Sequence, residues 1–225
     1  MHDSLAVIVA ARNEADRIGD TLAALRGALP GAALWVADDA SDDGTADAAM
    51  VAGAQVVSRG RPHGKGGNVT AAAEAALSSA PPPDVVLLCD GDLGPTAGRL
   101  GSLVEAVEED RCDLAVAAFS RRVGGGFGVA LGFARWAIRR RCGFEARAPI
   151  SGQRAIRVDA LRRVLPLAAG FGMEVGMTID AVRAGYRVAE YELDLAHRAT
   201  GRSIQGFAHR ARQLFDFVAA YSARR

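Results

Sequence analysis

The first half of the sequence alternates short, continuous apolar runs with segments of helical spacing. The runs LAVIVAA (5–11) and ALWVAD (33–38) have the length and composition of buried strands. Between them, apolar residues recur three or four positions apart, up to the helix-breaking pair at 30–31: Ile18, Leu22, Leu25 and Leu29. This pattern predicts a strand, a helix and a second strand parallel to the first.

The same alternation continues to residue 119 and then becomes less regular. It predicts strands at 54–57, 84–90 and 113–119, a helix over 68–78, and a helix carrying Leu100, Leu103, Val104 and Val107. Beyond these lie a basic glycine-rich loop at 120–128, a short strand at 150–156, a helix after Gly172, a strand at 186–193 and a C-terminal helix from about Ser203. The elements indicate an α/β fold with a doubly wound, mostly parallel central sheet flanked by helices, whose ligands bind at the carboxyl ends of the strands.

The amino-acid composition limits the class of protein but does not indicate a function. The 225 residues are 50% hydrophobic, enough for one sizeable core, so we expect a single domain over 1–225. A net charge of only +1 gives no general case for nucleic-acid binding. Cys89, Cys112 and Cys142 form no CxxC pair, which favours a reducing cytoplasm over a disulfide framework or a zinc site. The N-terminal apolar run is too short for a signal peptide, and no apolar stretch approaches the roughly 20 residues of a membrane span.

Two carboxylates at the end of the strand over 84–90 are the first candidates for chemistry. Asp90 and Asp92 are separated only by Gly91, which we expect to let the backbone turn so that both face one Mg²⁺ or Mn²⁺ ion. Such ions usually bridge one or two carboxylates to substrate phosphates, so the pair favours a nucleoside diphosphate ligand. The alternative is an ordinary solvated Asp-Gly-Asp turn.

Four motifs together resemble a known family. VIVAARNEADRI, VADDASDDGTAD, HGKGGN and CDGDL, in this order, resemble the signature of the family 2 nucleotide-sugar glycosyltransferases with the GT-A fold. The resemblance implies that Ala11, Asn13 and Glu14, together with Asp39 of an Asp38-Asp39 pair, hold the base and ribose of the donor. It also implies donor contacts for Asp90 and a phosphate contact for Lys65 within a flexible glycine-rich loop. The alternatives are that Asp39 caps a loop with Ser41 and Asp42, and that Lys65 is an ordinary solvated lysine.

The second half resembles two groups of that family. FSRRVGGGFG, ARWAIRRR and APISGQRAIR are similar to polyprenyl-phosphate glycosyltransferases of the dolichyl-phosphate mannosyltransferase type, whereas GFGMEVGMTIDAVRAGYRV and AHRATGR resemble glucosyl-3-phosphoglycerate synthase. Both acceptors carry phosphate, which guanidinium groups bind bidentately. The resemblances therefore imply an acceptor or phosphate site with these members: Arg121, Gly152, Gln153, Arg154 and Arg198. For the arginine run 139–141, a charged surface helix is the favoured interpretation.

Two further residues take roles from the resemblance to the synthase. His197 falls where a third metal ligand would complete the pair Asp90 and Asp92; a structural or surface histidine is the alternative. Glu174 is a candidate catalytic base or ligand of an acceptor hydroxyl, with Asp92 as the other catalytic residue; a polar residue at the edge of a core helix is its alternative. Gly94 stands where the mannosyltransferases carry glutamine, so their full metal arrangement is not carried over.

These features predict a metal-dependent hexosyltransferase that uses Mg²⁺ or Mn²⁺. We expect residues 1–120 to bind a nucleotide-sugar donor resembling UDP-glucose, and residues 121–225 to bind the phosphate-bearing acceptor. The alternatives are a sugar-phosphate nucleotidyltransferase and a non-catalytic nucleotide-sugar binding module. We expect a cytoplasmic protein without a nucleic-acid partner. Peripheral contact with the inner face of the membrane and a homodimer stay open, and the C-terminal helix is expected to dock on its own domain.

Overall fold

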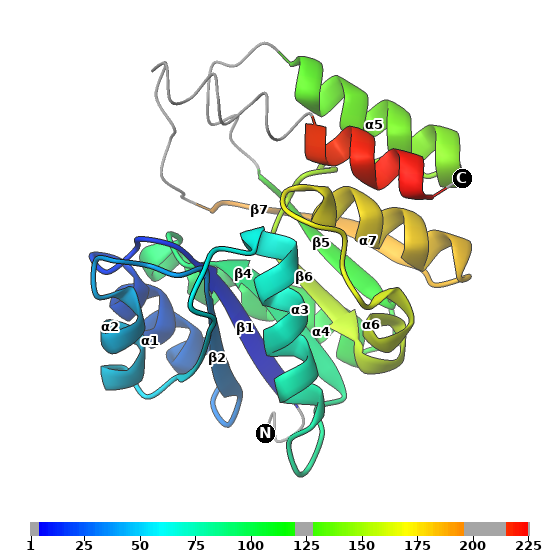
Figure 1. Ribbon diagram of the computed structural model, residues 1–225. Coiled ribbons are helices and arrows are strands. Elements are labelled where there is room, and N and C mark those ends of the chain that lie inside the picture. Colours follow the sequence, from blue (N-terminus) through cyan, green and yellow to red (C-terminus); the bar gives the residue numbers. More distant parts are fainter. Residues whose placement is uncertain (1–4, 120–127, 196–214, 225) are drawn as a thin grey trace.

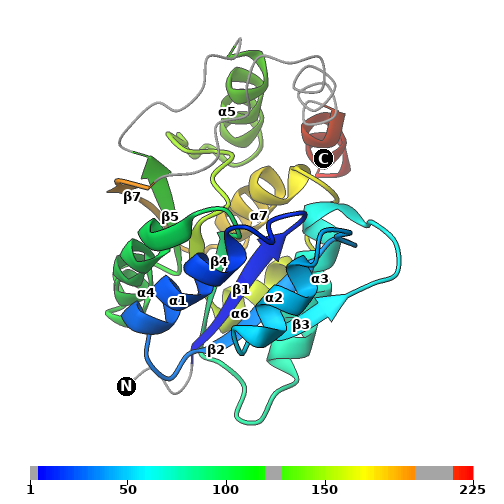
Figure 2. The ribbon, with the colours of Figure 1, turned by 90° about the vertical axis from the view of Figure 1, so that its left-hand side faces the viewer.

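The computed structural model describes residues 5–119, 128–195 and 215–224 and contains one seven-stranded sheet (Figures 1 and 2). The strands are β1 (Leu5–Ala11), β2 (Ala33–Asp38), β3 (Gln55–Ser58), β4 (Val85–Asp90), β5 (Leu114–Phe119), β6 (Arg154–Arg157) and β7 (Val188–Leu193). They are arranged in the order β3-β2-β1-β4-β6-β5-β7, and only β6 runs antiparallel to its neighbours. The predicted α/β, mostly parallel sheet is confirmed.

Helices cover both faces of the sheet. They are α1 (Ile18–Ala28), α2 (Thr45–Val51), α3 (Gly64–Leu77), α4 (Gly101–Glu108) after a 3₁₀ turn (Gly94–Leu100), α5 (Val129–Cys142), α6 (Val158–Val164) and α7 (Gly172–Arg183). Residues 215–223 are also helical. Successive side chains of a strand point to opposite faces, so Val7 and Val9 pack under α1 and α4 while Ala6 and Ile8 pack under α3, α6 and α7. A third cluster joins α5, α7 and residues 215–223.

Two predicted elements have different bounds in the structure. The helix expected over 68–78 begins at Gly64, so the glycine-rich motif is its first turn and not a flexible loop. The strand expected over 150–156 is confined to Arg154–Arg157, and residues 150–153 before it form a turn and a segment outside the regular elements. Both shifts lie at the carboxyl edge of the sheet, where they place side chains of the candidate site.

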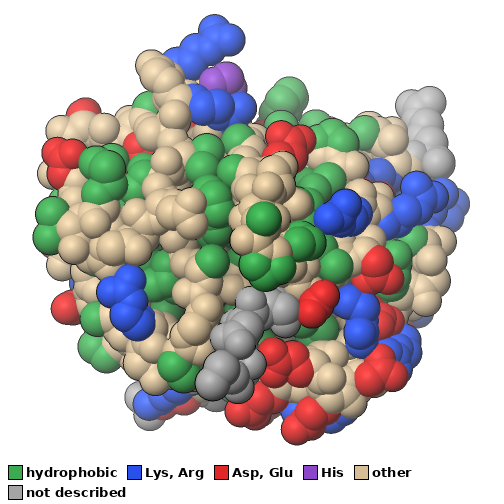
Figure 3. Space-filling view, turned by 90° about the horizontal axis from the view of Figure 1, so that it is seen from below, with side chains coloured by type: hydrophobic (Ala, Val, Ile, Leu, Met, Phe, Trp, Pro, Cys, Tyr) green, Lys and Arg blue, Asp and Glu red, His purple; other side chains and the backbone are tan. Residues whose placement is uncertain are grey.

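The other edge of the sheet has a different surface. Seen from below in Figure 3, the face that carries the N-terminus shows acidic and basic side chains interspersed along one border. Ion pairs on this side join Arg157 and Arg187 to Asp110 and Asp113. Within the described part of the chain, no helix has the length and apolar character needed to cross a bilayer.

Candidate functional site

The acidic pair at the end of β2 divides into two roles. Asp38 is buried, and its carboxylate accepts hydrogen bonds from the hydroxyls of Ser41 (2.5 Å) and Ser58 (2.9 Å). It therefore holds the loop after β2 to the edge strand β3. Asp39 follows it, and its amide donates to the carbonyl of Ala11 at the end of β1 (3.0 Å), so the two strand ends meet as predicted.

Asp39 is held by one carboxylate oxygen. Its Oδ1 accepts hydrogen bonds from the backbone amides of His63 (2.7 Å) and Gly64 (3.1 Å) and from the side-chain amide of Asn68. These backbone donors are the N-cap residue and the first residue of α3, so Asp39 serves as a remote cap for this helix. Its Oδ2 is directed to the exposed guanidinium of Arg12, 3.6 Å away. One oxygen is thus anchored, and the other is positioned beside a cation.

Asn68 and Arg59 support Asp39, and our sequence analysis missed both. Asn68 is 2% exposed, and its side-chain oxygen accepts two hydrogen bonds from Arg59, at 3.0 Å from Nε and 2.8 Å from Nη2. This contact fixes the orientation of the amide, so its Nδ2 must point to Asp39. The asparagine of HGKGGN was visible in the sequence, but its partners lie in two other segments.

The loop after β1 interlocks with the loop after β2. The Asn13 amide donates to the Ser41 hydroxyl (3.0 Å), and the Asn13 side chain accepts from the Asp42 amide (3.2 Å). The Glu14 amide donates to the hydroxyl of Thr45 (2.9 Å). Asn13 adopts a left-handed conformation with φ of 56°, which asparagine tolerates better than most residues. The structure therefore brings Ala11, Asn13, Glu14 and Asp39 into one corner.

The Asp90-Gly91-Asp92 turn is fixed by a buried threonine. The hydroxyl of Thr21 donates to the carbonyl of Gly91 (2.8 Å) and accepts from the amide of Gly94 (2.9 Å). The chain turns at residues 91–92, as expected, without a positive φ at Gly91; the left-handed residue is Gly94 (φ of 53°), which begins the 3₁₀ turn. Thr21 is a positioning residue. In the sequence it cannot be told from a core position, because it stands one helical turn before Leu25.

Lys65 lies between two carboxylates. Its Nζ is 2.5 Å from Oδ1 of Asp90 and 2.8 Å from Oε1 of Glu174, and the three side chains come from α3, β4 and α7. Burial alone would lower the pKa of Lys65, but the charges of Asp90 and Glu174 outweigh it and raise this pKa well above its usual value. Lys65 is therefore a charged, paired ammonium and not an ordinary solvated lysine. It is also the only lysine in the sequence.

Gln153 and Gly152 complete the surroundings of Asp90. The Gln153 side chain donates to Oδ2 of Asp90 (2.7 Å) and accepts from the hydroxyl of Ser151 (3.0 Å), which orients its amide. A Cβ added to Gly152 would clash with Nζ of Lys65 and lie 2.8 Å from Oδ2 of Asp90, so any larger residue here would require the ammonium or the carboxylate to move. Both oxygens of Asp90 are thus engaged by donors from α3 and from the segment before β6.

Arg154 has a different position from the one expected of a phosphate ligand. Its guanidinium is 0% exposed and donates to the carbonyls of Ser151 (2.8 Å) and Pro149 (3.4 Å) and to the hydroxyl of Thr178 (2.9 Å). Burial lowers its pKa to about 10, although nearby Glu174 opposes the shift. The prediction of a direct phosphate contact does not fit this buried geometry. Arg154 instead ties the segment before β6 to α7.

Glu174 lies in the first turn of α7 and is 3% exposed. Its carboxylate faces Lys65, and its backbone carbonyl accepts from Thr178, the same hydroxyl that Arg154 contacts. A carboxylate so placed can accept a hydrogen bond from a substrate hydroxyl at the edge of the Lys65 pair. Arg121, His197 and Arg198 lie outside the described residues, so their predicted roles stay predictions.

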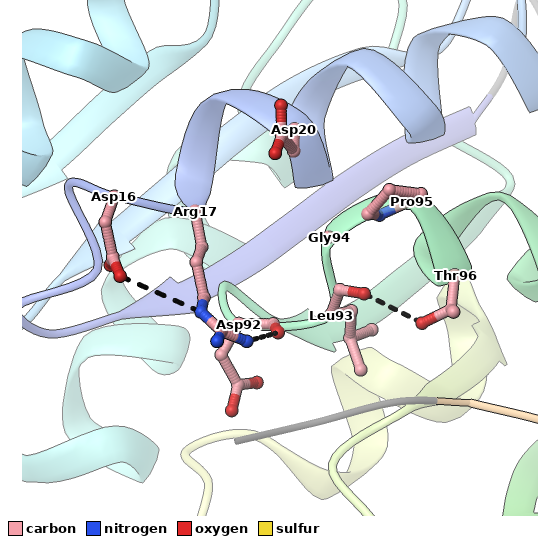
Figure 4. A pocket seen from close by; sticks show the side chains of 8 residues that line it. All are labelled: Asp16, Arg17, Asp20, Asp92, Leu93, Gly94, Pro95 and Thr96. Carbon is pink, nitrogen blue, oxygen red and sulfur yellow. Dashed lines mark hydrogen bonds and ion pairs between the residues drawn. The ribbon is translucent and has the colours of Figure 1, made fainter.

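A pocket of about 480 Å³ lies beside the Asp90–Asp92 turn, between this turn and the start of α1. Asp16, Arg17 and Asp20 line one side and the segment 92–96 lines the other; in Figure 4 the carboxylate of Asp92 points away from Asp20. Asp39, Lys65 and Glu174 are not among its lining residues. In the part of the chain that the structure describes, no three His, Cys, Asp or Glu side chains converge as a metal site.

Comparison with known proteins identifies the family. The model of glycosyl transferase family 2 matches residues 6–165, which contain all the described side chains around Asp39 and Asp90 except Glu174. The chain is a family 2 glycosyltransferase. The undecaprenyl-phosphate mannosyltransferase of Micrococcus luteus is 32% identical to it in an alignment of 212 residues that covers 87% of this chain and 85% of the relative.

Solved structures extend the comparison to the second half of the glycosyltransferase. Glucosyl-3-phosphoglycerate synthase from Mycobacterium tuberculosis, in complex with Mn²⁺, UDP-glucose and phosphoglyceric acid, is 26% identical with a TM-score of 0.75, covering 97% of this chain and 80% of that one. Its complex with Mg²⁺ and UDP gives 27% identity and a TM-score of 0.76, covering 97% and 79%. The GT-A fold and the resemblance to both groups of transferases are therefore confirmed, and membership of the family favours the transferase over the nucleotidyltransferase alternative.

Proposed function

We propose that this glycosyltransferase moves a hexose from a nucleoside diphosphate sugar, with UDP-glucose the favoured donor, to an acceptor that carries phosphate. The observation that carries the proposal is the convergence of Asp39, Lys65, Asp90 and Glu174 on the carboxyl edge of the sheet. Ligands of open α/β sheets bind at this edge. The donor half would comprise residues 1–120 and the acceptor half residues 121–225.

The base and ribose would occupy the corner formed by Ala11, Asn13, Glu14 and Asp39. Because Oδ1 of Asp39 accepts three hydrogen bonds from the protein, Oδ2 is the oxygen directed to a ligand. It would accept a hydrogen bond from a ring NH or a ribose hydroxyl. Arg12 is exposed and lies 3.6 Å from this oxygen. Its guanidinium would stack on the face of the base or bind the diphosphate.

The chemistry of Asp90 and Asp92 fits a Mg²⁺ or Mn²⁺ ion shared with the diphosphate. Hard cations of this kind take oxygen ligands and are commonly held by one or two carboxylates and substrate phosphates, which matches the carboxylate pair described here. Both oxygens of Asp90 already accept hydrogen bonds from Lys65 and Gln153, and Asp92 is proposed as a ligand together with it. His197 is proposed as a further ligand. When bound, the ion supplies charge neutralisation for the departing diphosphate.

The transferred hexose would lie against the ion pair of Lys65. Asp90 and Glu174 present carboxylate oxygens that would accept hydrogen bonds from sugar hydroxyls, and the Lys65 ammonium holds both carboxylates in place. An acceptor phosphate monoester is already ionised and needs no protein base; for a hydroxyl acceptor, Glu174 is the nearest described candidate for the base. Gly152 and Gln153 border Asp90 on the acceptor side, where Arg121 and Arg198 are proposed to bind phosphate.

The relatives differ in acceptor, as their names state: undecaprenyl phosphate in one case and phosphoglyceric acid in the other. Both acceptors carry a phosphate, so this chemistry is the shared expectation for the present chain. A cytoplasmic position is proposed with it.

The first test is thermal unfolding in the presence of UDP-, GDP- and dTDP-sugars, each with and without Mn²⁺. A ligand at about 100 times its dissociation constant stabilises by about 2.7 kcal/mol, which raises the melting temperature by a few degrees. We expect a metal-dependent shift with UDP-glucose. The absence of a shift with every sugar would contradict the proposed donor class.

The single lysine allows a second, site-specific test. Reductive methylation followed by mass spectrometry can report only on Lys65 and the N-terminal amine. We expect UDP-glucose with Mn²⁺ to slow the modification of Lys65 while the N-terminal amine reacts at the same rate. Equal rates at Lys65 with and without donor would remove this residue from the proposed sugar site.

A further inference from the structure

Two helices form a separate layer beyond α7. Helix α5 and residues 215–223 lie near each other above the carboxyl edge of the sheet (Figure 1). An aromatic trio joins them: the ring of Trp136 lies 5.0 Å from that of Tyr221 and 5.5 Å from that of Phe133, and Phe133 lies 6.1 Å from Tyr221. The guanidinium of Arg141 stacks 3.8 Å from the centre of the Tyr221 ring. This packing fits the prediction that the C-terminal helix docks on its own domain.

The outer side of this layer is unusually apolar. Of the seven large hydrophobic side chains that are exposed among the described residues, four lie on these two helices: Val129 (65%), Trp136 (49%), Phe215 (72%) and Val218 (42%). They adjoin the aromatic trio, because Val129 precedes Phe133 by one helical turn and Val218 lies one turn from both Phe215 and Tyr221. A strip of exposed apolar groups therefore crosses from one helix to the other.

The same layer is basic. Helix α5 contains four arginines and no acidic residue. Arg139 and Arg140 are exposed and lie three and four positions after Trp136, one helical turn along, so they flank its indole ring. The Arg139 side chain is 73% exposed, and its acidic partner is Glu145, 3.7 Å away beyond the end of the helix. The two-helix face is defined here as Val129, Trp136, Arg139, Arg140, Phe215 and Val218.

We propose that the two-helix face rests on the surface of an anionic lipid bilayer. Exposed tryptophan and aliphatic groups with flanking arginines suit the boundary between headgroups and acyl chains, and anionic lipids attract basic segments at close range. The arginines complement the lipid charge while the apolar strip enters the boundary. The inference rests on the proposed function, since a phosphate-bearing acceptor in a lipid would be met at this surface.

The C-terminal helix of the two-helix face contacts α7, the helix that carries Glu174. The Asp216 carboxylate accepts a hydrogen bond from the amide of Phe171 (3.0 Å), directly before the helix that carries Glu174. Arg224 forms a two-pronged contact with Asp180 of the same helix, with 2.8 Å from Nε to each carboxylate oxygen. A bilayer under the two-helix face would therefore lie next to the acceptor half of the molecule.

The test is sedimentation of the full chain with phosphatidylcholine vesicles that contain or lack phosphatidylglycerol. We expect binding to the anionic vesicles only, weakening as salt rises. Arg139→Glu with Arg140→Glu should lower the vesicle partition coefficient by at least about tenfold, because two attractive charges become repulsive. Trp136→Ser with Phe215→Ser should also lower it.

Matched controls separate this surface from general charge or hydrophobicity. Arg162→Glu with Arg163→Glu reverses two adjacent exposed arginines of α6, and Met50→Ser with Val51→Ser removes two exposed hydrophobics of α2. Both should bind vesicles as the unmodified chain does, and all variants should keep its circular dichroism spectrum. The arginine variant keeps the inference testable if the tryptophan variant fails to fold.

Three outcomes would overturn the inference. One is failure of the unmodified chain to bind anionic vesicles at low salt, and another is an equal loss of binding in the controls. The third is a dimer in solution that Trp136→Ser dissociates, because a second copy would then cover the face. The donor-dependent thermal shift is measured on the same samples: a shift without vesicle binding rejects this inference alone, whereas vesicle binding without a shift rejects the proposed function alone.

Discussion

The corner around Asp39 and the cluster around Lys65 are held in different ways. Asp39 is anchored by two backbone amides and one neutral side-chain amide, with charge only at its periphery. Lys65 is held by two carboxylates from different elements in a largely buried position. The first arrangement tolerates loss of a donor, but the second leaves two carboxylates without the ammonium between them when Lys65 is removed. The corner thus resembles a preformed binding surface, and the cluster is a charge network that depends on one ammonium.

Removing the ammonium should have the largest effect on stability. We expect Lys65→Met to lower the free energy of unfolding by about 3–5 kcal/mol, because it leaves Asp90 and Glu174 close together without the ammonium that pairs with both. Chemical denaturation measures this loss. Since the folded state of the unmodified chain raises the pKa of Lys65, its contribution is fully present below the usual lysine pKa and disappears only above it.

A second substitution at position 65 tests whether charge alone is sufficient. Lys65→Arg keeps the charge but needs more space than Gly152 leaves, so it should restore only part of the stability. Equal stability of the Arg variant and the unmodified chain would show that charge alone matters at this position.

The second prediction separates the metal ligand from the charge network. Asp92→Asn should reduce metal-dependent kcat by about 10² or more, since a charge-stabilising group at the reacting centre is lost. Its melting temperature should stay close to that of the unmodified chain, unlike that of the Lys65 variant. Initial rates across a Mn²⁺ titration measure the effect, and unchanged turnover would refute the assignment of Asp92.

The third prediction concerns the space beside Lys65. Gly152→Ala should cost about 1–3 kcal/mol of stability, because the new methyl group displaces Nζ of Lys65 or the Asp90 carboxylate. Gly27→Ala in α1 is the matched control, since nothing lies within 4 Å of its added Cβ. It should stabilise the chain by about 0.4–1 kcal/mol. Denaturation curves that show the same sign for both variants would contradict the crowding described at Gly152.

The smallest effect is expected at Asn68 in the Asp39 corner. Asn68→Leu should weaken donor binding by about tenfold with little change in kcat, because Asp39 loses one donor but keeps two backbone amides. Glu74→Gln, at an exposed position of the same helix, should leave binding unchanged. Isothermal titration with UDP-glucose distinguishes a positioning role from a structural one, in which donor affinity would follow overall stability.

The comparison also explains what could be read from the sequence. The apolar runs of β1, β2 and β4 were predicted within a residue or two, because buried parallel strands need continuous hydrophobic residues. The strand ends also placed Asp39 at the carboxyl edge, whereas Ala11, Asn13 and Glu14 beside it were implied by the resemblance to the glycosyltransferase family. The early start of α3 was not predicted, because its glycines disfavour helix and the cap that compensates is a carboxylate 25 positions away.

The members of the Lys65 cluster were named from the sequence, but their contacts with one another were not predicted, for a related reason. The contact from Gln153 to Asp90 spans 63 positions and exists only because β6 lies beside β4. The sequence pattern gives no sign that Arg154 is buried. Its segment resembles a phosphate-binding motif, so the sequence suggested that Arg154 contacts a ligand. Its three protein acceptors belong to Ser151, Pro149 and Thr178, which only the folded chain brings together.

The antiparallel strand β6 has a consequence for the order in which the protein is made. It lies between β4 and β5, although it is synthesised after both of them. A nascent chain that has left the ribosome only as far as β5 has open edges on two hydrophobic strands, because β4 and β5 have no direct pairing. The gap between β4 and β5 is filled when residues 154–157 emerge from the ribosome. We therefore expect the donor-binding strands to become fully protected from proteolysis only after this late segment is translated.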